Sequence, residues 1–273
     1  MPTSRVHRLD AELVRRGLAR SREQAVELIA SGRVEVNAVV AQKAASGVTA
    51  SHSIRVLADI DDPGYASRGA HKLVGALAAF PQITVQGRRC LDAGASTGGF
   101  TDVLLRSGAR EVVAVDVGYG QLVWSLRNDP RVQVHDRTNV RALAPEHIGG
   151  QADITVADLS FISLKLVLAA LTACTKPDGD LLPMVKPQFE VGKERIGSGG
   201  VVRDPALRAE VVADVAIAAA ALGWATAGVT ASPLPGPSGN VEFFLWLQRE
   251  PEHPLSPAEV AEVVRVSDPK GVS

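Results

Sequence analysis

Charged residues stand at or near the ends of five short apolar runs in this sequence. The runs are CLDAG, EVVAVDVG, RVQVHD, ADITVAD and DLLPMVK, and their charged residues are Asp92, Asp116, Asp136, Asp158 and Lys186. Such runs, alternating with helical segments, are typical of a largely parallel sheet covered by helices on both faces. Ligands of open α/β sheets bind outside the carboxyl ends of the strands. Any one of these residues could be a helix cap, but five together predict a lined crevice.

The segment LDAGASTGGF, residues 91–100, follows the first run and opens a helix. Its glycines let the backbone approach a ligand closely. The spacing is not the G-x-G-x-x-G of dinucleotide sites, so a pyrophosphate is not indicated. Instead, D-x-G-x-x-x-G, from Asp92 to Gly98, resembles the first motif of S-adenosylmethionine-dependent methyltransferases. A nicotinamide-type cofactor and a glycine-rich turn without a ligand are the less favoured alternatives.

The next two strand ends fit the same kind of site. Asp116 lies 24 residues beyond Asp92, where an acid can accept hydrogen bonds from ribose hydroxyls in related nucleotide-binding folds. Asp136 ends the third strand, where such methyltransferases usually contact adenine. We therefore expect the cofactor to lie across the ends of three neighbouring strands.

Lys72, Asp158, Lys186 and Glu242 form a set that can remove a proton from a hydroxyl. Two stand at strand ends, one precedes the glycine-rich segment, and one lies in the last strand, NVEFFLWLQ. Methylation of a ribose 2′-hydroxyl requires removal of its proton, and a neutral amine beside it is a suitable base. A second ammonium and partial burial favour the neutral amine, while acidic neighbours hold it in place. Taken singly, each residue is more simply explained as a surface ion pair.

The first 60 residues have a different pattern. RLDAELVRRGL and SREQAVELIASG have helical spacing; Gly17 and Gly32 are expected to end these helices, and Ser21 with Gln24 fits a capping box. RVEVNAVV, with a turn at Asn37-Ala38, and SIRVL are expected to be strands. This segment contains nine Lys/Arg and six Asp/Glu, a net charge of +3, and the remainder carries −4. A small basic module attached to a larger acidic domain favours polyanion binding, with chance asymmetry as the alternative.

Composition limits the other classes of protein. The chain has 273 residues, 46% of them hydrophobic, which is enough for two domains. Cys90 and Cys174 are far apart in apolar contexts, which indicates buried thiols in a reducing compartment. The six histidines have no ligand spacing, so we predict no metal site. No segment reads as a signal peptide, and the most apolar stretch, residues 215–228, is too short to span a bilayer and reads as a core helix ending near Gly223.

Several motifs together identify a family resemblance. SRGAHKL, LDAGASTGGF, DVGYGQL, ADLSFISL, VKPQFEVGK and SPLPGPSGNVEFFLWL resemble the TlyA family, once called hemolysin A, whose members are cytidine 2′-O-methyltransferases of ribosomal RNA. That family joins an S4-like RNA-binding domain, matched by RLDAELVRRGLARSREQA and GRVEVN, to a methyltransferase domain similar to the FtsJ/RrmJ type. The resemblance covers residues 5–248. One small departure is Asn37-Ala38, where the S4-like module often has Asn-Gly.

The resemblance implies the fold and its division into domains. The fold class is α/β: a Rossmann-like class I methyltransferase with a seven-stranded, mostly parallel sheet, and a small α+β S4-like domain before it. The expected domains are an S4-like RNA-binding domain over residues 1–60, a linker over 61–66, the methyltransferase domain over 67–250 and a C-terminal tail over 251–273.

The resemblance also implies the site residues. The catalytic tetrad would be Lys72, Asp158, Lys186 and Glu242, with Lys186 as the central amine. The cofactor would be S-adenosyl-L-methionine, held by Asp92, Gly94, Ser96, Gly98, Asp116 and Asp136. Arginine forks suit phosphate, so the predicted RNA-binding residues are Arg5, Arg8, Arg15, Arg16, Arg20, Arg22, Arg33 and Arg68.

The expected partner is ribosomal RNA within the 30S subunit, the 50S subunit or both, in the cytoplasm, with no membrane and no obligate protein partner. Three other functions were weighed: a non-enzymatic RNA-binding or ribosome-assembly factor, a membrane-active hemolysin and a pseudouridine synthase. The intact tetrad argues against the first, the lack of a predicted membrane segment against the second, and the glycine-rich loop against the third.

Overall fold

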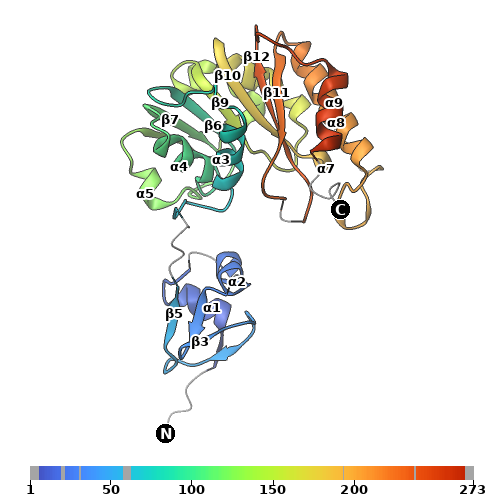
Figure 1. Ribbon diagram of the computed structural model, residues 1–273. Coiled ribbons are helices and arrows are strands. Elements are labelled where there is room, and N and C mark those ends of the chain that lie inside the picture. The colour runs from blue at the N-terminus through green and yellow to red at the C-terminus, as the bar shows by residue number, and fades with distance from the viewer. Residues whose placement is uncertain are drawn as a thin grey trace. The chain divides into compact units, whose positions relative to one another are not determined.

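The computed structural model describes residues 6–19, 22–30, 32–57, 63–192, 194–236 and 238–267. The chain divides into two compact units, with the boundary between Gly64 and Tyr65. Each unit has its own hydrophobic core (Figure 1).

The first unit packs two helices with short strands. Its elements are β1 (His7–Arg8), α1 (Leu9–Arg15), α2 (Arg22–Ala30), β2 (Val34–Val36), β3 (Val39–Val40), β4 (Gly47–Val48) and β5 (Ile54–Val56). The strands form a β1-β4 pair and a β3-β2-β5 sheet, all antiparallel. Leu9, Leu13, Ala25 and Ile29 are buried between the helices, as their spacing predicts.

The turns of this unit lie where the sequence predicts them, and one of them places an alanine in a left-handed conformation. Gly17 and Gly32 have positive φ just after α1 and α2, so both expected helix ends are confirmed. Asn37 and Ala38 form the two-residue turn between β2 and β3 with φ of 51° and 64°. This is the left-handed conformation of a type I′ turn, which alanine adopts at a cost. Ser21, the expected capping residue, lies outside the described residues.

A seven-stranded sheet forms the centre of the second unit. Its strands are β6 (Arg89–Ala93), β7 (Glu111–Val115), β8 (Val132–His135), β9 (Ala152–Ala157), β10 (Thr175–Val185), β11 (Ala225–Ala231) and β12 (Phe243–Gln248). The order across the sheet is β11-β12-β10-β9-β6-β7-β8, and only β12 runs against its neighbours. The predicted mostly parallel α/β sheet is therefore confirmed, and the five predicted parallel strands are adjacent in it.

Helices cover both faces of this sheet (Figure 1). They are α3 (Ala70–Ala79), α4 (Gly99–Arg106), α5 (Trp124–Arg127), α6 (Leu168–Cys174), α7 (Pro187–Glu190), α8 (Pro205–Ala220) and α9 (Pro257–Val266), with short 3-10 turns at Val140–Ala142, Pro145–Ile148, Leu164–Leu166 and Ser198–Gly200. One core layer joins the sheet to α3, α4 and α5, and the other joins it to α6, α8 and α9.

The last strand divides its side chains between the two layers. Phe243, Leu245 and Leu247 face the layer with α8, and Phe244 faces the layer with α3 and α4. This is the alternation that the sequence predicts for a strand buried on both sides.

Segments at both ends of the second unit are packed into it. Tyr65 and Ala66, which were expected to belong to the linker, contact α3 and α4. The Tyr65 ring packs against His71 of α3, and the Arg106 guanidinium of α4 lies 4.7 Å from its centroid. The Ala66 N–H donates to Asp102 of α4. Beyond residue 250, where a tail was expected, α9 begins with a capping box at Ser256 and buries Val260 against α8 and β11.

Candidate active site

Two buried ion pairs stand at the carboxyl ends of the central strands. Lys186 Nζ lies 2.6 Å from Asp158 Oδ1, and Lys72 Nζ lies 2.5 Å from Glu242 Oε2. Side-chain exposures are 9% and 23% for the first pair and 10% and 1% for the second. Surface ion pairs are mostly solvated and weakly held, whereas buried pairs such as these keep a fixed geometry.

Strand register brings the two pairs together. β10 and β12 pair through Val185 and Phe243, so the antiparallel register places Lys186, the next residue of β10, opposite Glu242. β9 ends at Ala157, beside Pro183 of β10, and Asp158 follows it. Lys72 comes from the first turn of α3. The four residues of the predicted set therefore face one site, although 170 positions separate Lys72 from Glu242.

Backbone contacts fix the acidic member of this set. The Asp158 N–H donates to the Ala93 carbonyl, and a Cβ on Gly94 would lie 2.4 Å from the Asp158 carbonyl oxygen. Any side chain at Gly94, whose φ is 90°, would therefore displace Asp158. Lys186 Nζ also donates to Ser160 Oγ at 2.9 Å, so the β9 loop holds the amine at two points.

A hollow of about 350 Å³ lies directly beside the ion pairs. It is lined by Ser67, Gly69, Gly94, Ala95, Ser96, Thr97, Gly99, Phe100 and Asp158. Six of the nine belong to the glycine-rich segment 94–100, which joins β6 to α4, and short side chains and a turn with positive φ at Ser96 and Gly98 leave the space open. Asp158 is shared by the hollow and the first ion pair, so this pair lies at the wall of the hollow.

Asp92 is the buried acid behind this loop. Its side chain is fully buried, Thr101 Oγ1 donates to Oδ2 at 2.6 Å, and Oδ1 has no hydrogen-bond partner in the described part of the chain. Burial raises the pKa of Asp92 to about 7, and the nearby Asp158 carboxylate acts in the same direction. A buried carboxyl oxygen without a partner is costly, which is typical of a group reserved for a ligand.

The other two predicted cofactor acids hold loops in place. Asp116 accepts from the backbone N–H groups of Ser96 and Gly118, at 2.8 and 2.7 Å, and so ties the glycine-rich loop to the loop after β7. Asp136 is paired with Arg127 at 2.9 Å, and that hydrogen bond lowers the pKa of its carboxyl. Asp136 does not line the hollow.

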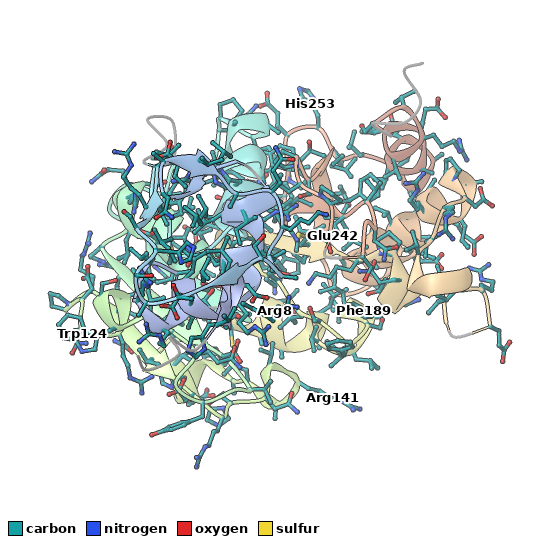
Figure 2. The ribbon with its side chains drawn as sticks, turned by 90° about the horizontal axis from the view of Figure 1, so that it is seen from below. Arg8, Trp124, Arg141, Phe189, Glu242 and His253 are labelled. Carbon is teal, nitrogen blue, oxygen red and sulfur yellow. The ribbon has the colours of Figure 1, made fainter. Side chains whose placement is uncertain are left out.

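Glu190, at the end of α7, was not identified from the sequence. Its carboxylate accepts from Ser163 Oγ at 2.6 Å and from the Leu164 N–H at 2.7 Å, and burial raises its pKa. The Phe161 and Phe189 rings, 5.2 Å apart, join the same two loops (Figure 2 labels Phe189 and Glu242). Phe161 is 91% exposed and has a φ of 64°. The available signal was an acid four residues after Lys186 in VKPQFE.

We expect Glu190→Ala to lower kcat about tenfold with unchanged affinity for cofactor and substrate, because the β9 loop carrying Asp158 loses its attachment to α7. Glu190→Gln should recover most of this loss. The matched control is Asp180→Ala, since Asp180 also accepts two side-chain hydrogen bonds, from Trp246 and Gln248, but lies in β10 away from its carboxyl end. Steady-state kinetics of the three variants would reject this role if Glu190→Ala and Asp180→Ala lowered kcat equally.

The predicted RNA-binding arginines divide into three groups. Arg8, Arg15, Arg16 and Arg22 surround α1 and are paired with Asp10 and Glu12. Arg33 donates to the Leu57 carbonyl, and Arg68 is exposed just before α3. Arg5 and Arg20 lie outside the described residues.

The described part of the chain contains neither a metal-binding cluster of side chains nor a membrane-spanning helix. No group of three or more His, Cys, Asp or Glu side chains there is arranged to hold a metal ion. No helix among the described residues is long and apolar enough to cross a membrane.

A glycine-rich loop after the first strand, a hollow beside it and a seven-stranded sheet with one reversed strand define a Rossmann-like methyltransferase. Comparison with known proteins gives the family. Residues 65–249 match the FtsJ-like methyltransferase family and residues 7–54 match the S4 domain. This enzyme belongs to the TlyA branch of the FtsJ-like methyltransferases, as the sequence motifs predicted.

Relatives support this assignment over nearly the whole chain. The 16S/23S rRNA (cytidine-2′-O)-methyltransferase TlyA of Mycobacterium tuberculosis is 61% identical over 94% of this chain and 95% of its own. Hemolysin A of Brachyspira hyodysenteriae is 35% identical over 86% and 97%. A solved structure from Streptococcus thermophilus that carries the name hemolysin matches with a TM-score of 0.76 and 36% identity, covering 97% of this chain and 96% of that one.

Proposed function

We propose that this enzyme transfers a methyl group from S-adenosyl-L-methionine to the ribose 2′-hydroxyl of cytidine in ribosomal RNA. The observation that carries the proposal is the pairing of Lys72 with Glu242 and of Lys186 with Asp158 at the wall of the glycine-lined hollow. The names of the relatives from M. tuberculosis and Campylobacter jejuni supply the cytidine and the ribosomal RNA.

The hollow fits S-adenosylmethionine on three counts. Its glycines are positions that a Cβ would fill: at Gly99 it would lie 2.3 Å from Ser67 Oγ. The buried Asp92 Oδ1 lacks a partner, which suits a cationic ligand. Val117, beside Asp116 at the end of β7, is 74% exposed and available to an adenine ring. Gly94, Ser96, Gly98, Asp116 and Asp136 complete the proposed cofactor set.

The tetrad prepares the hydroxyl for transfer. When bound, the cofactor supplies an electrophilic methyl group. Glu242 orients the Lys72 amine and Asp158 orients the Lys186 amine. One of these amines, in its neutral form, would accept the proton of the ribose hydroxyl, and the other, as an ammonium, would donate a hydrogen bond to the hydroxyl oxygen. Burial excludes water from these amines, and positioning of the hydroxyl contributes much of the rate.

The S4 unit is proposed to bind the RNA through its arginines. Phosphates would be contacted by Arg5, Arg8, Arg15, Arg20, Arg22 and Arg33, and by Arg68 near the active site. Arg16 is left out because Glu12 and backbone carbonyls hold its guanidinium group. The substrate would be the 30S subunit, the 50S subunit or both. This places the reaction in the cytoplasm, where ribosomes are assembled.

The test is a map of ribose methylation on ribosomal RNA. Cells lacking the gene are compared after complementation with the wild-type protein or with Lys186→Ala, and both subunits are mapped. We expect one or two cytidine 2′-O-methyl marks with the wild type and none with the variant. A wild-type protein that restores no mark in either subunit would refute the proposed substrate.

A further inference from the structure

Two guanidinium groups of the first unit converge on one buried carboxylate. Arg8 donates to both oxygens of Asp10, Nε to Oδ1 at 3.1 Å and Nη2 to Oδ2 at 2.9 Å. Arg22 Nη2 donates to the same Oδ2 at 3.1 Å. Arg8 directly precedes α1 and Arg22 is the first residue of α2, so Asp10 joins the start of one helix to the start of the other (Arg8 is labelled in Figure 2).

Glu12, two residues further along α1, likewise accepts hydrogen bonds from two arginines. Arg15 donates to it through Nε and Nη2 at 2.7 and 2.6 Å, and Arg16 through Nε at 2.7 Å. Arg16 also donates to the carbonyls of His52 and Thr49, at 2.8 and 3.0 Å, and therefore links α1 to the β4–β5 connection. Within the part of the chain that the structure describes, Arg15 has no such second hydrogen-bond partner.

Charge and burial are arranged in layers. The side chains of Asp10 and Glu12 are 3% and 0% exposed, whereas those of Arg8, Arg15 and Arg22 are 53–57% exposed. Hydrogen bonds from these arginines lower the pKa of both acids to about 2, so the acids stay ionised. A ligand approaching from solvent therefore meets three guanidinium groups, with the compensating carboxylates beneath them.

We propose that Asp10 and Glu12 are organisers of a phosphate-binding surface formed by Arg8, Arg15 and Arg22. The proposal rests on an RNA substrate, and it deepens that function by assigning a role to two acids. Like charges repel, and long side chains lose rotamer freedom on binding; a buried carboxylate beneath them offsets both effects before the ligand arrives. The outward N–H donors that remain on each fork suit the oxygens of RNA phosphates.

This role predicts an effect opposite in sign to that of net charge. Asp10→Asn removes one negative charge from an RNA-binding unit, which by simple electrostatics strengthens binding. If Asp10 organises the surface, the full-length variant should instead bind a fluorescently labelled fragment of large-subunit ribosomal RNA about tenfold more weakly at 0.1 M salt, with kcat at saturating RNA unchanged. The salt slope of log Kd should fall by about one phosphate contact.

Glu35→Gln is the matched control, because Glu35 belongs to the same unit but pairs with Arg55, at 3.3 Å. It removes the same charge and is expected to leave Kd equal or slightly lower. Thermal unfolding followed by circular dichroism checks that each variant is folded. If Asp10→Asn disrupts the first unit, Arg8→Lys decides the matter, since it keeps the charge but loses the fork onto Asp10 and should also weaken binding.

The outcomes separate this inference from the proposed function. A wild-type protein that does not bind the RNA contradicts the proposed function. A wild-type protein that binds, together with a folded Asp10→Asn that binds as tightly or more tightly, overturns the role of Asp10. Wild-type affinity in Arg8→Lys overturns it equally.

Discussion

Lys186→Met is expected to lower the rate of methyl transfer by at least about 10³-fold while the protein still binds S-adenosylmethionine. Methionine keeps the length and apolar stem of lysine but removes the amine that Asp158 and Ser160 hold in place. Removal of an acid–base group typically costs 10²–10⁴ in rate, and loss of a group that also positions the substrate adds to it. Lys186 is not one of the residues that line the hollow, so the hollow keeps its lining in the variant.

A second lysine–aspartate pair on the same strand provides the control. Lys176 Nζ lies 2.6 Å from Asp153 Oδ1, the same distance as between Lys186 and Asp158, but near the start of β10 rather than its end. Lys176→Met should leave kcat unchanged within about twofold, as expected for a more exposed ion pair with little energetic weight. Transfer of tritium from labelled cofactor to ribosomal subunits measures both variants. If Lys186→Met transferred methyl groups at a rate within tenfold of the wild-type rate, Lys186 would not belong to the proposed tetrad.

Asp92→Asn is expected to change the pH dependence of stability. Burial raises the pKa of Asp92 to about 7 in the folded protein, above its ordinary value of 3.8. The folded state thus holds the proton more tightly than the unfolded chain does, so the neutral carboxyl contributes its full stability below pH 4 and loses it as the pH rises to 7. The total amounts to about 4 kcal/mol, because each pKa unit corresponds to about 1.4 kcal/mol and the group is fully buried.

Asparagine cannot ionise, so its stability does not follow this curve. The free energy of unfolding of Asp92→Asn minus that of the wild type should therefore rise by about 2–3 kcal/mol between pH 5 and pH 8, whatever constant cost the amide brings. Urea unfolding without cofactor at the two pH values measures it. Thr101→Val, which removes the hydroxyl that stabilises the ionised Asp92, should steepen the dependence. If the difference between the two free energies of unfolding did not change with pH, the pKa of Asp92 would be the same in the folded and unfolded protein.

The fold was predictable because its signals are local. Each apolar run between charged ends became a strand, and the alternation in NVEFFLWLQ correctly divided Phe243 and Phe244 between the two core layers. The segment after residue 250 was underestimated, since its capping box and buried Val260 gain meaning only when α8 and β11 lie beneath them.

The site was predictable in composition but not in its pairing. Residue types and the family resemblance indicated Lys72, Asp158, Lys186 and Glu242, yet the sequence does not specify which lysine meets which acid. Glu190 was missed for the same reason: its partners, Ser163 and Leu164, belong to a different loop. The sequence also could not show that Arg16 donates to backbone carbonyls, whereas the neighbouring arginines are exposed.

The position of β12 has a consequence for the order of folding. This strand lies between β10 and β11 although it is synthesised after both, and it carries the segment with Glu242 into the site. Contacts over such a separation form late, because chain closure must precede them. A nascent chain emerging from the ribosome therefore already has its glycine-rich loop but lacks a complete tetrad. If the proposed tetrad carries out the transfer, methylating capacity arises only with the insertion of this penultimate element, and the enzyme modifies no RNA before it is almost fully made.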